Sequence, residues 1–366
     1  MQARAQRIWS HPVRRGWHVG LNVLSSAKPP EQVPERRSDT VSAGIETSAK
    51  RTGGPRDPQE EPGIWSLAAR HPRAVVLICI GIVSLAGWMY LAAMVAAMLP
   101  VMDMGELGPG MALFNAFNIF AGLPAEARAL LAAICLPEGA STFGMPASAV
   151  WSVHDMLLVL VMWVAMALAM MLPTAAPVIA NFAERARRDP QAGGYGLPAG
   201  RATLVLTLGY LSVWMAYAVV ATAAQAALTM AGALTPMMAP VTTVLAGTTL
   251  VAAGIYQFTP AKAACLWRCR NPKLFFASHR PASLAETFRL GVMQGMFCFG
   301  CCWALMTVMF AVGIMNVLWI ALLGLLMGLE KTFLSERLPQ VIGVFLLLWG
   351  GFLLSLAAFG RVALAG

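Results

Sequence analysis

Three cysteines, Cys298, Cys301 and Cys302, fall within five consecutive residues of a long apolar segment. On a helix, positions i and i+3 share a face, so Cys298 and Cys301 point the same way and Cys302 lies on that side too. Thiolates at this spacing suit a soft ion such as Cu(I), or zinc. They can instead cycle to a disulfide. One buried cysteine usually acts only as a small apolar side chain, but three together favour metal or redox chemistry.

A methionine stripe at positions 162, 166 and 170 lies at helical spacing in a second apolar segment. At about 1.5 Å per residue, Met162, Met166 and the three cysteines all fall near the middle of a bilayer core about 30 Å thick. Thioether sulfur complements thiolate as a soft ligand, although a methionine stripe in a membrane most often serves packing alone. We therefore predict that the cysteines face Met162 and Met166 across a bundle interior, with Met170 completing the stripe.

His154 and Asp155 are the only histidine and the only acid in the outer half of any predicted span. Ionisable groups within a membrane are costly and usually face the bundle interior. With Met306 near the same level, the pair is predicted to form an entry ligand or a proton-linked site. The alternative is an interfacial pair at a helix end.

Polar residues and two further cysteines gather at the opposite ends of the apolar segments. Lys331 is expected to extend to the lipid headgroups, because long basic side chains keep their charge in water. The other residues are predicted either to line an inner vestibule or to serve as interfacial anchors: Tyr256, Gln257, Lys262, Cys265, Cys269 and Glu330.

These residues belong to a chain of 366 residues that is 58% apolar and only 12% charged. Soluble domains are about 45–50% apolar and about 25% charged, so a water-soluble enzyme is excluded. Since about 20 apolar residues cross a bilayer, the chain is predicted to be an all-α, polytopic transmembrane helical bundle of about seven spans. The predicted spans are 74–99, 149–174, 203–230, 241–259, 290–312, 316–335 and 340–360.

The domain organisation follows from composition and charge. Residues 1–73 hold 12 Lys/Arg, 7 Asp/Glu and eight prolines, which is typical of a disordered basic tail. The bundle is predicted over 74–366, with an outer loop at 100–148. Alternate connections carry 24 and 2 Lys/Arg. The basic side is cytoplasmic by the positive-inside rule, so the N-terminus is predicted inside and the C-terminus outside. The net charge of +9 thus reflects topology, and no nucleic-acid partner is needed.

Prolines and glycines give two further expectations. The segment Pro173–Pro177 is predicted to end the second span, because proline lacks an N–H donor and its ring clashes with the preceding turn. The small-residue pairs Gly291-x3-Gly295 and Gly324-x3-Gly328 are predicted to let the fifth and sixth spans pack closely as a hairpin.

Several ordered motifs run through the apolar part of the chain. They are Met162-Trp163-x2-Met166-x3-Met170-Met171-x-Pro173-x3-Pro177, Gly254-Ile-Tyr256-Gln257-x2-Pro260-x-Lys262-x2-Cys265-Leu-x2-Cys269-Arg270-x-Pro272, Gly291-x3-Gly295-x2-Cys298-x-Gly300-Cys301-Cys302-Trp303-x-Leu305-Met306, and Gly313-x-Met315-Asn316 through Glu330-Lys331.

Over roughly 74–360 these motifs resemble a bacterial family of predicted metal-binding integral membrane proteins, a domain of unknown function. The resemblance implies a bacterial inner-membrane protein with metal binding. It supplies no reaction, and nothing carries over to the 1–73 tail.

Three functions remain open. The first is a metal-binding membrane protein, for copper above all, that takes the ion from outside and holds it or delivers it to a partner protein. The second is a thiol/disulfide redox protein acting with a partner or quinone, although no haem-binding Cys-x-x-Cys-His motif is present. The third is a secondary transporter of another solute, although repeats or broken helix pairs are not visible. No Walker A motif, nucleophile elbow or HExxH occurs, so the sequence favours a non-enzymatic protein without a nucleotide or flavin motif.

Overall fold

The computed structural model describes residues 71–99, 103–118, 151–189, 198–235, 238–333 and 335–365, together with Leu123 and Ala127. These residues lie in one compact unit, Glu60–Gly366. The described part is all-α, with one isolated β-bridge between Leu234 and Pro240. Its main helices are α3 (Pro72–Met98), α5 (Val153–Arg188), α6 (Ala199–Met230), α7 (Thr243–Gln257), α8 (Pro260–Arg270), α9 (Pro272–Ala277), α10 (Leu284–Thr307), α11 (Met309–Val312), α12 (Val317–Thr332) and α13 (Arg337–Ala365).

Five of the described helical segments are long and apolar enough to cross a membrane: α3, α5, α6, α10 with α11, and α13. The chain is therefore a multi-pass, membrane-type helical protein. The helices α7 and α12 occupy the two other predicted spans but have only 15 and 16 residues. Both fall short of the about 20 residues that a straight crossing needs. By length, five helical segments among the described residues are candidates for crossing a membrane, and the count of seven stays a prediction.

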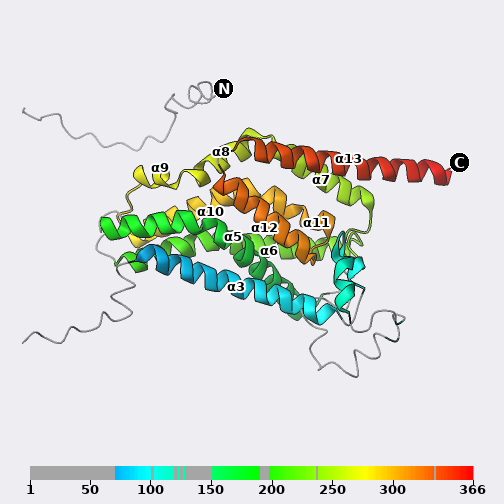
Figure 1. The fold of residues 1–366 in the computed structure, drawn as a ribbon, viewed down its shortest axis with the longest axis horizontal. Helices are drawn as coiled ribbons and strands as arrows, with labels where there is room; N and C mark the ends of the chain where they lie inside the picture. Colours follow the sequence, from blue (N-terminus) through cyan, green and yellow to red (C-terminus); the bar gives the residue numbers. More distant parts are fainter. Residues whose placement is uncertain are drawn as a thin grey trace, which may run out of the picture. The chain divides into compact units, whose positions relative to one another are not determined.

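Glycines allow two pairs of helices to pack closely, α10 with α6 and α7 with α13, and α7 and α13 lie side by side in Figure 1. A Cβ on Gly291 of α10 would lie 2.1 Å from the Leu206 carbonyl oxygen of α6, so these two backbones touch. In the same way Gly247 and Gly350 bring α7 against α13. The prediction that Gly291-x3-Gly295 and Gly324-x3-Gly328 join the fifth and sixth spans was wrong. The first pair faces α6, and Gly324 lies against Met170 of α5.

The helix α5 continues through both of its prolines to Arg188, so the prediction that Pro173–Pro177 ends the span was wrong. Pro173 cannot donate to the carbonyl of Ala169, four residues earlier. The Ser84 hydroxyl on α3 donates to that carbonyl instead, at 3.1 Å. A neighbouring helix therefore replaces the lost bond, and the helix has no need to end in water.

The described part of the 100–148 loop is anchored to the turn between α11 and α12. Two 3₁₀ helices form it, Met104–Leu107 and Met111–Phe117. The Asn316 side chain caps α12 by accepting from Trp319 N–H, and its amide donates to the Pro109 carbonyl at 3.0 Å. Gly313 has a φ of +99° and touches the Leu107 carbonyl, where a side chain would not fit. Apart from Leu123 and Ala127, the remainder of the loop lies outside the described residues, as does the 1–70 part of the predicted tail.

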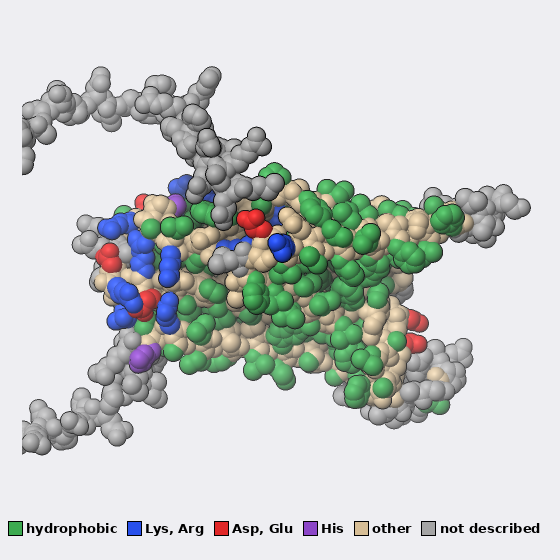
Figure 2. Space-filling model, turned by 45° about the horizontal axis from the view of Figure 1, so that its top comes forward, with side chains coloured by type: hydrophobic (Ala, Val, Ile, Leu, Met, Phe, Trp, Pro, Cys, Tyr) green, Lys and Arg blue, Asp and Glu red, His purple; other side chains and the backbone are tan. Residues whose placement is uncertain are grey.

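Most of the basic side chains visible in Figure 2 gather at its left end, whereas apolar side chains predominate over the rest of that face, with a few charged ones near the middle and at the right. Arg73 at the start of α3, Arg185 and Arg188 at the end of α5, and Lys273 in α9 line one hollow there. The charge separation predicted from the sequence thus corresponds to a separation in space.

Candidate metal centre

The three α10 cysteines are all buried, with 1–3% of each side chain exposed. Cys301 and Cys302 bring their sulfurs within 3.3 Å of each other. The Cys301 thiol also donates to the Cys298 carbonyl at 3.1 Å. The contact with the Cys298 carbonyl follows from helix geometry, because a side chain at position 301 lies over the preceding turn of the same helix. The sequence prediction of a shared, inward-facing thiol cluster agrees with this burial.

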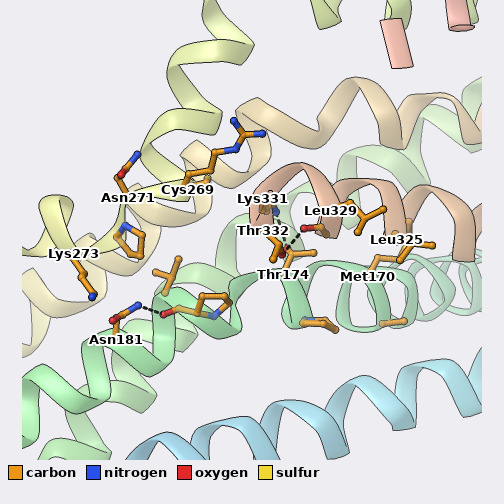
Figure 3. Close-up of a pocket in the computed structure, with 18 of the residues that line it drawn as sticks. Met170, Thr174, Asn181, Cys269, Asn271, Lys273, Leu325, Leu329, Lys331 and Thr332 are labelled. Atoms are coloured by element: carbon orange, nitrogen blue, oxygen red, sulfur yellow. Dashed lines mark hydrogen bonds between the residues drawn. The ribbon is translucent and has the colours of Figure 1, made fainter. Parts of the chain in front are cut away.

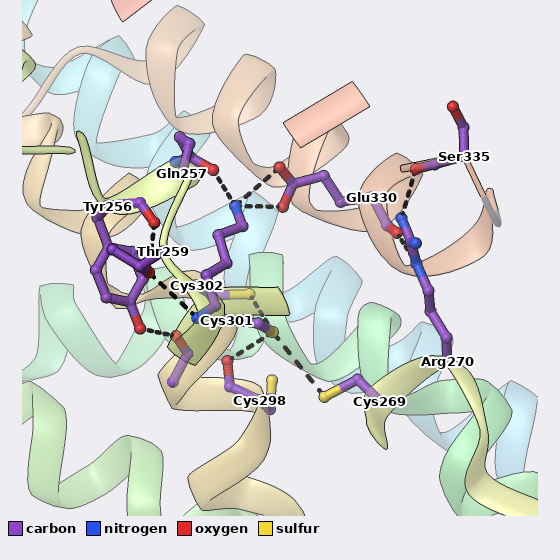
Figure 4. A network of polar contacts seen from close by, with 12 residues as sticks. Tyr256, Gln257, Thr259, Cys269, Arg270, Cys298, Cys301, Cys302, Glu330 and Ser335 are labelled. Atoms are coloured by element: carbon purple, nitrogen blue, oxygen red, sulfur yellow. Dashed lines mark hydrogen bonds and ion pairs between the residues drawn. The ribbon is translucent and has the colours of Figure 1, made fainter. Parts of the chain in front are cut away.

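A fourth cysteine joins the cluster from another helix. Cys269, near the end of α8, is buried and places its sulfur 3.9 Å from that of Cys301 (Figure 4). Two sulfurs that share one ion at about 2.3 Å each lie about 3.8–4.0 Å apart, so this pair has the separation of two ligands of one metal. Cys301 and Cys302, at 3.3 Å, are closer than that and need a side-chain rotation to bind the same ion.

Cys298 has polar partners in addition to the neighbouring thiols of Cys301 and Cys302. The ammonium of Lys331 lies 3.0 Å from its sulfur and donates to the Thr174 hydroxyl at 2.7 Å. The Tyr210 hydroxyl lies 3.0 Å from the same sulfur and also donates to the Met171 carbonyl. Lys331 therefore turns into the protein, and the expectation that it extends to the headgroups was wrong. The Cys298 thiol on α10 and the Thr174 hydroxyl on α5 supply the polar contacts that water would otherwise give to the Lys331 ammonium.

Cys265 lies at the edge of the cluster. A Cβ on Gly300 would lie 2.6 Å from the Cys265 sulfur, so the absence of a side chain at Gly300 lets α8 approach α10. The Tyr256 hydroxyl donates to the Gly300 carbonyl at 2.6 Å beside it. Partial burial raises the pKa of the Cys265 thiol, which keeps it protonated at neutral pH.

A fully buried ion pair ties α8 to α12. Lys262 and Glu330 are each 1% exposed, and the ammonium lies 2.8 and 2.9 Å from the two carboxylate oxygens. Lys262 also donates to the Gln257 side chain. Arg270 donates to the backbone carbonyl of Glu330 at 2.7 Å (Figure 4). Several residues predicted to line an inner vestibule, Gln257, Lys262 and Glu330, thus hydrogen-bond to one another and fix α8 against α12. Cys265 and Cys269 are carried by α8.

The methionine stripe is buried, as is Met306. On α5, Trp163 stacks on Phe310 with ring centroids 5.7 Å apart, whereas Thr174 reaches Cys298 through Lys331. The cysteines therefore lie closer to the level of Met170 than to that of Met162. The contact predicted between the cysteines and Met162 or Met166 stays a prediction.

His154 and Asp155 stand at the start of α5. The Asp155 carboxylate accepts from the Ser152 hydroxyl at 2.7 Å and from the Ser152 N–H at 2.8 Å, forming a capping box. His154 is exposed. This geometry gives Asp155 the helix-end role that was the alternative interpretation of the pair.

A pocket of about 750 Å³ reaches the edge of the thiol cluster (Figure 3). It lies between α5, the α8–α9 junction and α12, and Met170, Thr174, Cys269 and Lys331 are among its lining residues. The pocket offers a route by which a ligand reaches Cys269. Among the described residues, no set of three or more His, Cys, Asp and Glu is already arranged around one metal position.

The sequence did not reveal Tyr210, Thr174 or Lys331 as neighbours of the thiols. Their only sequence signal is that polar side chains in apolar helices seldom lack a partner. The contact between Cys269 and Cys301 was only weakly indicated by the sequence, by the presence of five cysteines within the 38 residues 265–302.

Buried sulfur side chains in a multi-pass helical protein are suitable ligands for soft metal ions. The PpoB2 family model, described as a copper chaperone, matches residues 160–353, more than half of the chain. The chain therefore belongs to the PpoB2 copper chaperone family, which confirms the resemblance to a metal-binding membrane family. No curated protein and no solved structure matches it. The matched residues include Cys269, Cys301 and the methionine stripe but not His154 or Asp155.

Proposed function

We propose that this chain is a membrane-embedded chaperone that carries Cu(I) as cargo between the thiolates of Cys269 and Cys301. The observation that supports it most strongly is the 3.9 Å separation of these two buried sulfurs, which come from different helices. Cu(I) prefers thiolate and thioether ligands, and a separation of 3.9 Å matches two ligands of a three-sulfur site with metal–sulfur bonds of about 2.3 Å. Copper is the substrate of this function, and it leaves with an unidentified partner protein.

Rotation of neighbouring side chains supplies the further ligands. Cys302 turns away from Cys301 to become a third thiolate, and Cys298 joins once its sulfur leaves Lys331. Met170 lines the pocket beside Cys269 and offers a thioether there. Met162, Met166 and Met306 provide further soft sulfur toward the outer end of the bundle, where His154 is exposed as an entry ligand and Asp155 caps the helix.

We further propose that the chain lies in a bacterial inner membrane with its basic end and the 1–73 tail in the cytoplasm. The basic side chains gathered at one end support this orientation. A cysteine in place of the exposed Leu113 should then react with an impermeant reagent in intact cells, whereas one in place of Ser48 should react only after permeabilisation. Reaction of both from outside would contradict the orientation.

Copper content of the protein purified in detergent tests the function directly. The wild type should retain about one Cu(I) per chain after competition with a soluble chelator. The variant Cys298→Ser/Cys301→Ser/Cys302→Ser should retain none, because serine oxygen is a poor ligand for a soft ion. Equal copper on both proteins would contradict the proposal.

The second candidate is a thiol/disulfide redox protein, and the Cys269–Cys301 separation favours it as well. Oxidation of this pair would form one S–S bond and release two protons and two electrons to a partner or quinone. Cys301 and Cys302 are less suited, because adjacent Cα atoms lie about 3.8 Å apart, below the usual 4.4–6.8 Å of a disulfide. Reversible loss of two thiols in a wild type that binds no copper would favour this candidate.

A further inference from the structure

The pocket beside Cys269 is lined by cations without acidic residues. Arg270, Lys273 and Lys331 contribute to its wall, and no Asp or Glu is among the lining residues (Figure 3). Three positive charges around one pocket create a potential that attracts an anion. The pocket's volume of about 750 Å³ falls within the range of about 300–1,000 Å³ typical of small-molecule sites.

Among the described residues, none of these three cations forms an ion pair with a carboxylate within 4.0 Å. The ion pairs among the described residues join Glu184 to Arg187 and Arg188, and Lys262 to Glu330. Glu330 directs its carboxylate to Lys262 and offers Arg270 only its backbone carbonyl. The hydrogen bonds of Arg270 and Lys331 likewise go to carbonyls, a hydroxyl and a thiol. An anionic ligand would therefore add negative charge on the pocket side of these cations, where no carboxylate lines the wall.

The remaining walls indicate what else the ligand carries. Met170, Pro173, Leu325 and Leu329 are apolar, whereas Thr174 and Thr332 provide hydroxyl groups. Two lining residues also contact the buried thiols: Cys269 contacts the Cys301 sulfur, and Lys331 contacts the Cys298 sulfur. A ligand bound by the cations would thus place its other groups beside the Cys269 sulfur, which contacts the buried Cys301 thiol.

We propose that this pocket binds a small anionic thiol, of up to short-peptide size, that brings Cu(I) to Cys269. The inference rests on the proposed copper function and deepens it by naming the donor. Small thiols keep a reducing cytoplasm reduced, and the pocket lies toward the basic end that we assign to that side. Thiolate ligands of Cu(I) exchange readily, so a tethered donor can pass its ion to a neighbouring sulfur.

The transfer is a ligand exchange without electron transfer. The bond between Cu(I) and the donor sulfur breaks as a bond from Cu(I) to the Cys269 sulfur forms. The Cys269 thiol proton passes to the departing donor thiolate, which leaves as a free thiol, and copper remains Cu(I) throughout. The carboxylate of the donor stays with Arg270 and Lys273 until the exchange is complete.

The test compares two copper donors of similar size that differ in charge, thioglycolate and 2-mercaptoethanol. Each is mixed as its Cu(I) complex with the full-length protein in neutral detergent, and copper per chain is followed after rapid desalting. The wild type should load faster from thioglycolate. Lys273→Gln should lower that rate roughly three- to tenfold, leaving loading from 2-mercaptoethanol and the final copper content unchanged. The advantage should shrink at high salt.

Two further variants keep the test decisive. Lys273 is exposed, and no hydrogen bond or ion pair joins its side chain to another described residue, so its replacement should leave the fold intact. Arg268→Gln is the matched control, because Arg268 is exposed on α8, lies over the Phe297 ring and does not line the pocket. It should load like the wild type. Arg270→Gln should slow loading from thioglycolate as Lys273→Gln does.

The outcomes separate the inference from the function on which it rests. Full copper content without any dependence on donor charge would overturn the inference alone. No copper on the wild type from either donor would overturn the proposed function and the inference with it. If the wild type retains phosphatidylglycerol through detergent washes, Lys273→Gln loses it and donor charge has no effect, the pocket holds a lipid headgroup and the inference is wrong.

Discussion

Serine in place of Cys269 is expected to weaken copper retention at least tenfold, whereas serine in place of Cys265 should leave retention nearly unchanged. A tenfold loss corresponds to about 1.4 kcal/mol of binding free energy. Cys269 supplies the sulfur from the second helix, 3.9 Å from Cys301, and without it the cluster draws on α10 alone. Cys265 lies against the Gly300 backbone instead. The measurement is copper per chain after competition with a graded series of Cu(I) chelators.

The two serine variants control for each other. Both replace a thiol by a hydroxyl in the same helix, four residues apart, so a general effect on α8 should appear in both. Thermal unfolding in detergent should show that each variant folds. Full copper on Cys269→Ser, or an equal loss on Cys265→Ser, would contradict a site built on the Cys269–Cys301 pair.

Methionine in place of Lys262 is expected to destabilise the protein by about 3–5 kcal/mol, the usual cost of leaving one charge of a buried pair alone. The Glu330 carboxylate would lose the ammonium that contacts both of its oxygens, in a place where only 1% of the residue is exposed. Since this pair joins α8 to α12, the variant should also hold Cys269 less firmly. Thermal unfolding and copper retention measure the two effects.

Replacing both charges provides the control for that variant. Lys262→Met/Glu330→Leu removes the unpaired carboxylate, and apolar pairs often match or exceed buried ion pairs in stability. It should therefore regain most of the stability that Lys262→Met loses. If Lys262→Met unfolds within about 0.5 kcal/mol of the wild type, as surface substitutions do, the pair does not hold α8 in place.

Hydropathy predicted those elements that depend on composition alone. The expected spans 74–99 and 203–230 lie within a few residues of α3 and α6. The prediction that Pro173–Pro177 ends the second span was wrong because a neighbouring helix supplies a hydrogen bond that the helix itself lacks. Ser84 supplies the hydrogen bond that Pro173 cannot make, so α5 continues to Arg188. The sequence of α5 alone does not predict this hydrogen bond, because its donor lies on α3.

The candidate site shows the same division. The shared face of the α10 cysteines follows from helical spacing, and their burial agrees with it. The position of Cys269 beside Cys301 depends instead on how α8 packs against α10 and α12. The Gly300 contact fixes α8 on α10, and the Lys262–Glu330 pair fixes it on α12. Lys331 was misassigned to the headgroups because its partners lie 33 and 157 residues away, on α10 and α5.

X-ray absorption spectroscopy at the copper edge, on the full-length protein loaded with one equivalent of Cu(I), tests the thiolate site most directly. We expect sulfur atoms alone to be bound to the ion, two or three of them. We also expect Cys269→Ser/Cys301→Ser to abolish this signal. Copper bound to nitrogen or oxygen in the wild type, or a sulfur signal that persists in the double variant, would contradict a thiolate site between α8 and α10.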